Sequence, residues 1–132
     1  MQAALTQPRT WIGYWLMGVA VLHTLFAAVV FGEVLLKIAE RGLFNSVGTD
    51  TLIAATVWFV LFGFALALFA MAVNPLERSG QRTALRQLGF GLLLLSVLGI
   101  VLMPVSGFWL AIPPALAMLR KGTSASPLKA CA

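Results

Sequence analysis

Three long apolar runs, joined by two short polar segments, make up most of the chain. The first run covers residues 11–32 and contains a single histidine, His23, near its middle. The second covers residues 51–73 without a charge, and at ~1.5 Å per residue a helix of this length crosses a bilayer. The polar segments 37–50 and 74–87 contain the glycine, asparagine and proline that are typical of loops.

The third apolar run, residues 88–119, is too long for one membrane span. As a single straight helix it would measure ~48 Å, whereas the hydrocarbon core of a bilayer is ~30 Å thick. The sequence Met-Pro-Val-Ser-Gly at residues 103–107 provides a turn, so the run predicts two antiparallel helices. The predicted helices are about 11–36, 51–73, 82–103 and 105–120.

The composition indicates that these helices lie in a lipid bilayer. Of 132 residues, 61% are hydrophobic and 10% are charged, and the mean hydropathy is +0.98. A water-soluble domain of this size cannot bury so much apolar surface, whereas a bilayer accommodates it. We therefore expect an all-α integral membrane protein, an antiparallel bundle of four transmembrane helices (residues 1–120) followed by a flexible cytoplasmic tail (residues 121–132).

The basic residues indicate orientation rather than a nucleic-acid partner, although the net charge is +5. They flank the apolar runs, which is the pattern of topology signals. With both termini cytoplasmic, that side holds seven of the nine Lys and Arg, and we expect the bacterial inner membrane. The arginines of segment 74–87, together with Glu77, are interpreted as a solvated face that contacts lipid headgroups. The seven cytoplasmic residues are Arg9, Arg78, Arg82, Arg86, Arg120, Lys121 and Lys129.

Small residues recur on every predicted helix, and such residues let membrane helices approach closely. The first helix carries Ala20, Thr24, Ala28 and Gly32 at four-residue spacing. We expect a compact bundle in the bilayer, and a spare small-residue face permits a homodimer or a membrane partner protein. The single cysteine, Cys131, cannot form an internal disulfide and is expected to be inert.

His23 is the candidate centre of a functional site. It lies twelve residues after Trp11, ~18 Å along the axis and slightly past the midplane toward the outer leaflet. Because an imidazole in hydrocarbon is costly, we expect it to point into the bundle and form a hydrogen bond. Three roles are open for His23. It fixes the helix register through a hydrogen bond to a Ser, a Thr, a Trp or a backbone carbonyl. Alternatively, it contacts a ligand or transfers a proton, or it ligates haem or a metal.

The remaining site candidates would surround His23. Trp58, Phe108 and Trp109 would supply aromatic walls and Ser106 a hydroxyl near the turn, while Glu33 and Asp50 would form an outer rim. Pro113 and Pro114 leave the carbonyls four residues earlier without their helical donors, which predicts either a kink or a pocket wall. Thr49 or Asp50 is expected to cap the second helix.

No sequence motif identifies a reaction. The chain lacks a Walker loop, a dinucleotide fingerprint, a Gly-x-Ser-x-Gly elbow and zinc-ligand spacing, and no carboxylate shares the depth of His23. We predict no cofactor. Haem would need a second axial ligand from a dimer or a methionine, because the chain has one histidine. Whether the protein is an enzyme stays open at this point.

Several short segments resemble a known family. They are Gly-Val-Ala-Val-Leu-His at residues 18–23, Trp-Phe-Val-Leu-Phe-Gly at 58–63, the turn at 77–80, and Pro-Val-Ser-Gly-Phe-Trp-Leu at 104–110 with Pro-Pro-Ala at 113–115. They are similar to an uncharacterised family of small four-helix bacterial inner-membrane proteins, a domain of unknown function. The resemblance implies four helices and a bacterial membrane, and no activity.

The sequence thus favours a binding protein. We expect an outward-facing cavity near His23 that takes an apolar or amphipathic ligand, such as a lipid, a quinone or a sterol-like molecule. Two alternatives remain. One is an intramembrane enzyme or haem-containing redox subunit that uses His23, and the other is a structural accessory subunit of a membrane complex.

Overall fold

The computed structural model describes residues 10–42 and 44–123, and these residues form helices and connecting turns without a β-strand. The all-α prediction is confirmed. The helical segments number five α-helices and one short 3-10 helix rather than four helices. They are α1 (Ile12–Val30), α2 (Gly32–Arg41), α3 (Thr51–Ser79), α4 (Arg82–Leu102), the 3-10 helix η1 (Gly107–Ala111) and α5 (Ile112–Thr123).

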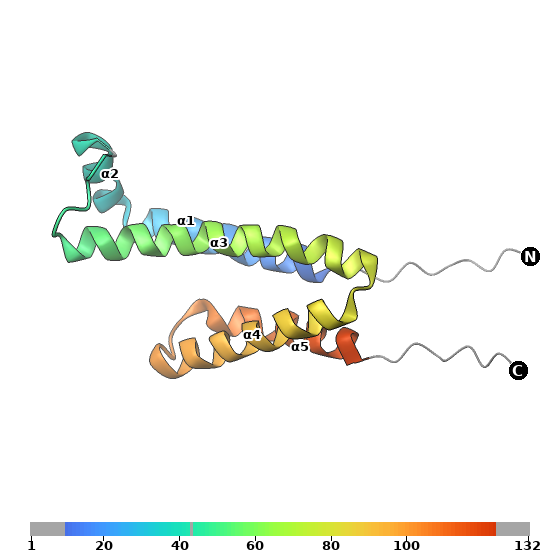
Figure 1. Cartoon of the computed structure of the whole chain (residues 1–132). Helices are drawn as coiled ribbons and strands as arrows, with labels where there is room; N and C mark the ends of the chain where they lie inside the picture. The colour runs from blue at the N-terminus through green and yellow to red at the C-terminus, as the bar shows by residue number, and fades with distance from the viewer. Residues whose placement is uncertain (1–9, 43, 124–132) are drawn as a thin grey trace, which may run out of the picture.

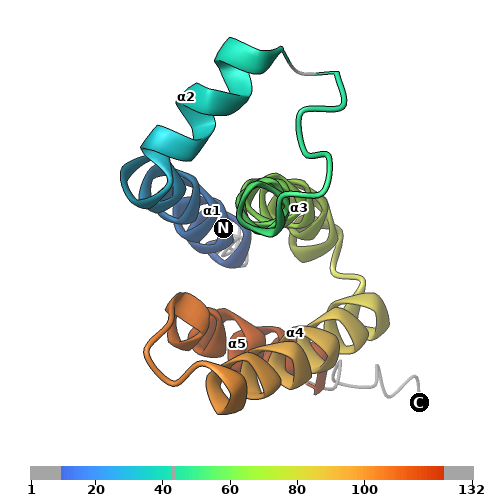
Figure 2. The same cartoon turned by 90° about the vertical axis from the view of Figure 1, so that its left-hand side faces the viewer.

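Two helical hairpins lie side by side (Figure 1). Helix α1 runs antiparallel to α3, and α4 runs antiparallel to α5, while α2 turns away from the pair that α1 and α3 form (Figures 1 and 2). At one end of the bundle α1 and α4 begin and α3 and α5 end. We call this the basal end and the opposite one the distal end.

The buried core lies toward the basal end and contains residues from both hairpins. Its apolar side chains come from the beginning of α1, the end of α3, the first half of α4, the last residue of η1 and the middle of α5. This core therefore joins the two hairpins, whereas the distal ends of the hairpins contribute little to it. Its members are Ile12, Leu16, Ala70, Val73, Leu85, Leu92, Ala111, Ala115 and Met118.

The predicted first helix, residues 11–36, is two helices that meet at Phe31. Phe31 has φ −108° and ψ 16°, outside the helical range, and α2 then leaves in a new direction. The break coincides with a change of composition from the apolar residues of α1 to the charged residues of α2. Helix α2 contains Glu33, Lys37, Glu40 and Arg41 and buries Ile38, so it is amphipathic and suited to a membrane surface.

The predicted second helix, residues 51–73, begins as expected but runs on through Pro75 to Ser79. Asp50 caps its first turn, accepting hydrogen bonds from the backbone N–H groups of Leu52 (3.0 Å) and Ile53 (3.2 Å). The helix ends at Gly80, whose φ of 66° is the left-handed conformation favoured by glycine. A proline inside a helix is tolerated where tertiary contacts fix the following turn, and Glu77 provides such contacts, described below.

The predicted fourth helix, residues 105–120, is divided into η1 and α5, and α5 continues to Thr123. Pro113 and Pro114 occupy the first turn of α5, where a helix needs no amide donors, so they start a helix rather than kink one. Residues 121–123, which were assigned to the predicted tail (121–132), are the last residues of α5. Residues 124–132, including Cys131, lie outside the described residues.

Helix α5 packs so closely on α4 that only glycine fits at residue 89. A Cβ there would lie 2.7 Å from Met118 Cβ and 3.1 and 3.2 Å from backbone atoms of Ala115 and Leu119. We predict that Gly89→Ala lowers the free energy of unfolding by about 1–3 kcal/mol, because the backbone of α5 must move. Denaturant titration of the detergent-solubilised protein measures the change. Gly91→Ala on the same helix is the control, since nothing lies within 4 Å of its Cβ. An equal loss in the two variants would contradict this packing.

Candidate ligand-binding site

His23 links the two helices of the first hairpin. Its Nε2 lies 3.0 Å from the backbone oxygen of Phe59, and its ring stacks on the Phe59 ring with centroids 4.1 Å apart and planes 15° from parallel. Because a carbonyl oxygen only accepts hydrogen bonds, Nε2 carries the hydrogen and Nδ1 is the nitrogen left for another partner. Gly63 permits this approach, since a Cβ there would lie 3.1 Å from His23 Cδ2 and 2.7 Å from Thr24 Oγ1.

A row of aromatic rings continues from His23 toward the second hairpin. The Phe62 ring meets His23 edge-on at a centroid distance of 5.5 Å, and Phe108 of η1 meets Phe62 at 6.3 Å. Phe108 in turn lies against Gly99 of α4. Toward the distal end, away from the shared core, the hairpins therefore meet through aromatic side chains.

Trp58 lies on the same face of α3 as Phe62. It precedes Phe62 by four residues, so the two side chains lie on one face of the helix, one turn apart. Trp58 is 72% exposed and Phe62 is 39% exposed. We call His23, Trp58, Phe62 and Phe108 the aromatic shelf. His23, Trp58 and Phe108 were predicted from the sequence as site residues, whereas Phe62 was not, although its four-residue spacing from Trp58 was an available signal.

Trp109 and Ser106 belong to the turn between α4 and α5 and not to the shelf. The Trp109 indole donates a hydrogen bond to the backbone oxygen of Pro104 (3.0 Å), and more than half of the side chain is exposed. Ser106 Oγ is buried and has no hydrogen-bond partner in the described part of the chain. A second indole, that of Trp15, donates to the carbonyl of Leu110 (2.9 Å), four residues before Pro114, which has no amide hydrogen to donate to it.

The two carboxylates expected at the rim have other positions. Asp50 is the cap of α3, so its carboxylate accepts from backbone amides, and Glu33 lies exposed in the first turn of α2. Within residues 10–42 and 44–123, neither one forms a hydrogen bond or ion pair with His23. In the same ranges no group of three His, Cys, Asp or Glu side chains is placed to hold a metal ion.

Glu77 is the polar residue that sequence analysis misjudged. It was expected on a solvated face, but it is 4% exposed. Its Oε1 accepts from the N–H of Trp11 (3.3 Å) and its Oε2 from the N–H of Ile12 (3.1 Å), and Oε1 also pairs with the ammonium group of Lys121. We call Glu77, Lys121 and these two amides the basal clamp. It connects α3 with the beginning of α1 and the end of α5.

A signal for the basal clamp exists in the sequence. Helix α1 begins at Ile12 without a capping side chain of its own, because its N-cap residue is Trp11. A helix that begins without Ser, Thr, Asp or Asn needs acceptors from elsewhere. Glu77 follows the buried residues Ala70 and Val73 at helical spacing, which places it on the inner face of α3.

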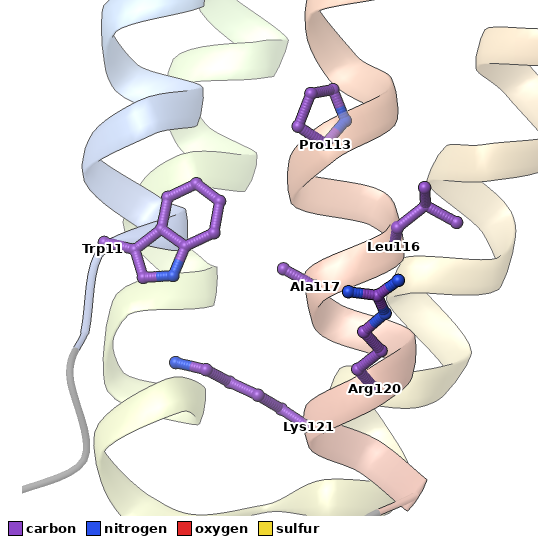
Figure 3. A pocket seen from close by; sticks show the side chains of 6 residues that line it. All are labelled: Trp11, Pro113, Leu116, Ala117, Arg120 and Lys121. Carbon is purple, nitrogen blue, oxygen red and sulfur yellow. The ribbon is translucent and has the colours of Figure 1, made fainter.

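A groove opens beside the basal clamp, between α1 and α5 (Figure 3). Its volume is about 400 Å³. The Trp11 ring forms one side of the groove and residues of α5 form the other, with the two basic side chains at its basal end. The lining residues are Trp11, Pro113, Leu116, Ala117, Arg120 and Lys121.

The fold and these sites define an all-helical protein with membrane-spanning potential. Three helices of the described chain, α1, α3 and α4, are long and apolar enough to cross a bilayer. The chain matches the model of a family of unknown function (DUF6463) over residues 7–125, and it belongs to this family. No curated protein and no solved structure matches the chain significantly.

The basal clamp predicts a large effect of one substitution. Glu77→Ala should lower the free energy of unfolding by about 3 kcal/mol or more, because it leaves a cation and the first amides of α1 without their acceptor. Denaturant unfolding in detergent measures the loss. Glu40→Ala, at an exposed carboxylate in α2, is the control and should change stability by less than about 0.5 kcal/mol. Similar values for the two variants would show that the clamp is not a stabilising contact.

Proposed function

We propose that this chain is a small multi-pass membrane protein that binds an apolar or amphipathic ligand, such as a lipid, a quinone or a sterol-like molecule, on the aromatic shelf. The observation that supports it is the row of rings from His23 through Phe62 to Phe108, with Trp58 beside it. Aromatic rings that are partly open, with one polar group among them, suit a ligand with a large apolar body and a polar end.

The polar end of the ligand would meet His23. Nε2 is bonded to Phe59, so Nδ1 is the atom that would accept a hydrogen bond from a hydroxyl or phenol of the ligand. The buried hydroxyl of Ser106, at the neighbouring turn, is a second candidate for a polar contact. In this proposal Trp109, Glu33 and Asp50 act outside the shelf, at the turn and in the distal segments.

We further propose four membrane spans, with both termini in the cytoplasm of a bacterium and the basal end at the inner surface of its plasma membrane. Helix α5 has 12 residues and η1 has five, and together they extend ~28 Å at ~1.5 and ~2.0 Å per residue. This length approaches the ~30 Å of the hydrocarbon core. The excess of arginine and lysine at the basal end follows the positive-inside rule.

The topology predicts where a maleimide reaches the chain. In spheroplasts, a membrane-impermeant maleimide should leave Cys131, the single cysteine, unlabelled until the membrane is permeabilised. In the comparison protein, Cys131→Ser with Phe44→Cys, the new cysteine replaces an exposed residue between α2 and α3 and should react directly. Mass spectrometry of the labelled protein gives both results. Direct labelling at residue 131 with protection at residue 44 would reverse the proposed orientation.

The shelf predicts a bound small molecule that depends on Phe62. Native mass spectrometry of the wild-type protein, purified in mild detergent, should show one apolar or amphipathic molecule per chain. Phe62→Ala should weaken its retention about tenfold or more, because burying an aromatic ring contributes about 1.5–3 kcal/mol. Phe90→Ala, at an exposed ring of α4, should retain the molecule as wild type does.

A second variant separates binding from structure at His23. His23→Phe keeps a ring that can stack on Phe59 and removes the polar contact, so it should release the ligand while the helical circular dichroism and the unfolding midpoint change little. If both Phe62→Ala and His23→Phe retain the ligand fully, the proposal is wrong, and His23 only fixes the register of α1 against α3. A wild-type protein that carries no such molecule would also refute the proposal.

A further inference from the structure

The basal end gathers most of the charge of the described chain. The last turn of α5 lies against the first turns of α4, since a Cβ on Gly122 would lie 2.5 Å from Arg86 Cβ and 2.9 Å from the backbone oxygen of Arg82. Arg78 is on the last turn of α3, where its guanidinium donates a hydrogen bond to the Tyr14 hydroxyl (3.0 Å). The end therefore combines five cations with one anion, namely Arg78, Arg82, Arg86, Arg120 and Lys121 with Glu77.

The single anion at this end is already compensated. Glu77 is almost fully buried and paired with Lys121 and with two backbone amides of α1. The Lys121 side chain remains 33% exposed and lines the groove, next to the exposed Arg120. A group that enters the basal end of the groove therefore meets a net positive potential.

The remaining wall of the groove is apolar. The indole of Trp11 lies opposite Pro113, and Leu116 and Ala117 continue the α5 side toward the basic residues (Figure 3). A volume of about 400 Å³ is within the range of small-molecule sites. The groove thus combines an apolar wall with two cations at one end, an arrangement that matches an acyl chain joined to an anionic headgroup.

We propose that this groove binds an anionic phospholipid. Arg120 and Lys121 would contact the phosphodiester of the headgroup, and an acyl chain would lie between Trp11 and the α5 wall. Charge complementarity supports this occupant, because basic pockets at the cytoplasmic side of helix bundles attract acidic headgroups. Trp11 supports it as well, since an indole at the headgroup level is a common feature of membrane proteins. This site is separate from the aromatic shelf and does not depend on a ligand there.

The test uses the fluorescence of Trp11 in nanodiscs. Phosphatidylglycerol with bromine atoms near the top of one acyl chain should quench Trp11 more strongly than brominated phosphatidylcholine at the same mole fraction. The fluorescence of Trp11 is obtained by subtracting the fluorescence of the Trp11→Phe variant from that of the wild-type protein. Arg120→Gln should lower the preference for phosphatidylglycerol about fivefold, the size of one attraction between a surface cation and an acidic lipid.

Two controls make the outcome decisive. Arg41→Gln removes an exposed arginine from α2, away from the basal end, and should leave the preference unchanged. Inorganic phosphate at millimolar concentration should also leave it unchanged, because phosphate lacks the acyl chain. Equal quenching by the two lipids, an equal effect of Arg41→Gln, or loss of the preference in phosphate would each overturn the proposal, the last in favour of a free-anion site.

Discussion

The fold depends on the burial of one carboxylate, that of Glu77. An unpaired charge in an apolar interior is very costly, so this side chain is stable there only with several hydrogen-bond donors. It finds them in the amides of Trp11 and Ile12, at the N-terminus of α1, and in Lys121 of α5. The N-terminus of a helix carries a partial positive charge, which adds to the attraction. One acidic residue on α3 thereby fixes the ends of two other helices.

The same contact explains why the two ends of the bundle differ. At the basal end, the clamp and the aliphatic core join α1, α3, α4 and α5. Outside the clamp and the core, the hairpins are joined by the hydrogen bond from the Trp15 indole to the Leu110 carbonyl and, further toward the distal end, by the contact between the rings of Phe62 and Phe108. An aromatic pair contributes about 0.5–1.5 kcal/mol beyond the area that it buries. A ligand on the proposed shelf would therefore disturb ring contacts and leave the basal clamp intact.

Hydrophobic runs and turn signals were sufficient to predict the helical class, the start of α3 at Thr51 and the turn after α4. They did not predict the break at Phe31 or the passage of α3 through Pro75, because both depend on partners distant in sequence or on the position of the membrane surface. The site shows the same division. The depth of His23 in an apolar run was enough to predict that it forms a hydrogen bond. Its partner, the Phe59 carbonyl, could not be predicted, because the contact depends on the close approach of α1 to α3 at Gly63. The basal clamp could not be predicted from one segment of the sequence, because its groups come from α3, the beginning of α1 and the end of α5.

The chemistry of the two candidate sites follows from the charge that each end carries. The aromatic shelf contains no charged side chain, and its histidine already donates one hydrogen to a backbone carbonyl, so a charged ligand group there would be poorly compensated. A neutral ligand with a single donor fits better. The groove at the basal end has the opposite character, because Lys121 and Glu77 together are neutral and Arg120 adds a positive charge to the lining. An anion is stabilised there and a cation is repelled. The two proposed sites therefore differ in charge because Glu77, the buried carboxylate of the described chain, is paired at the basal end and leaves the arginines there in excess.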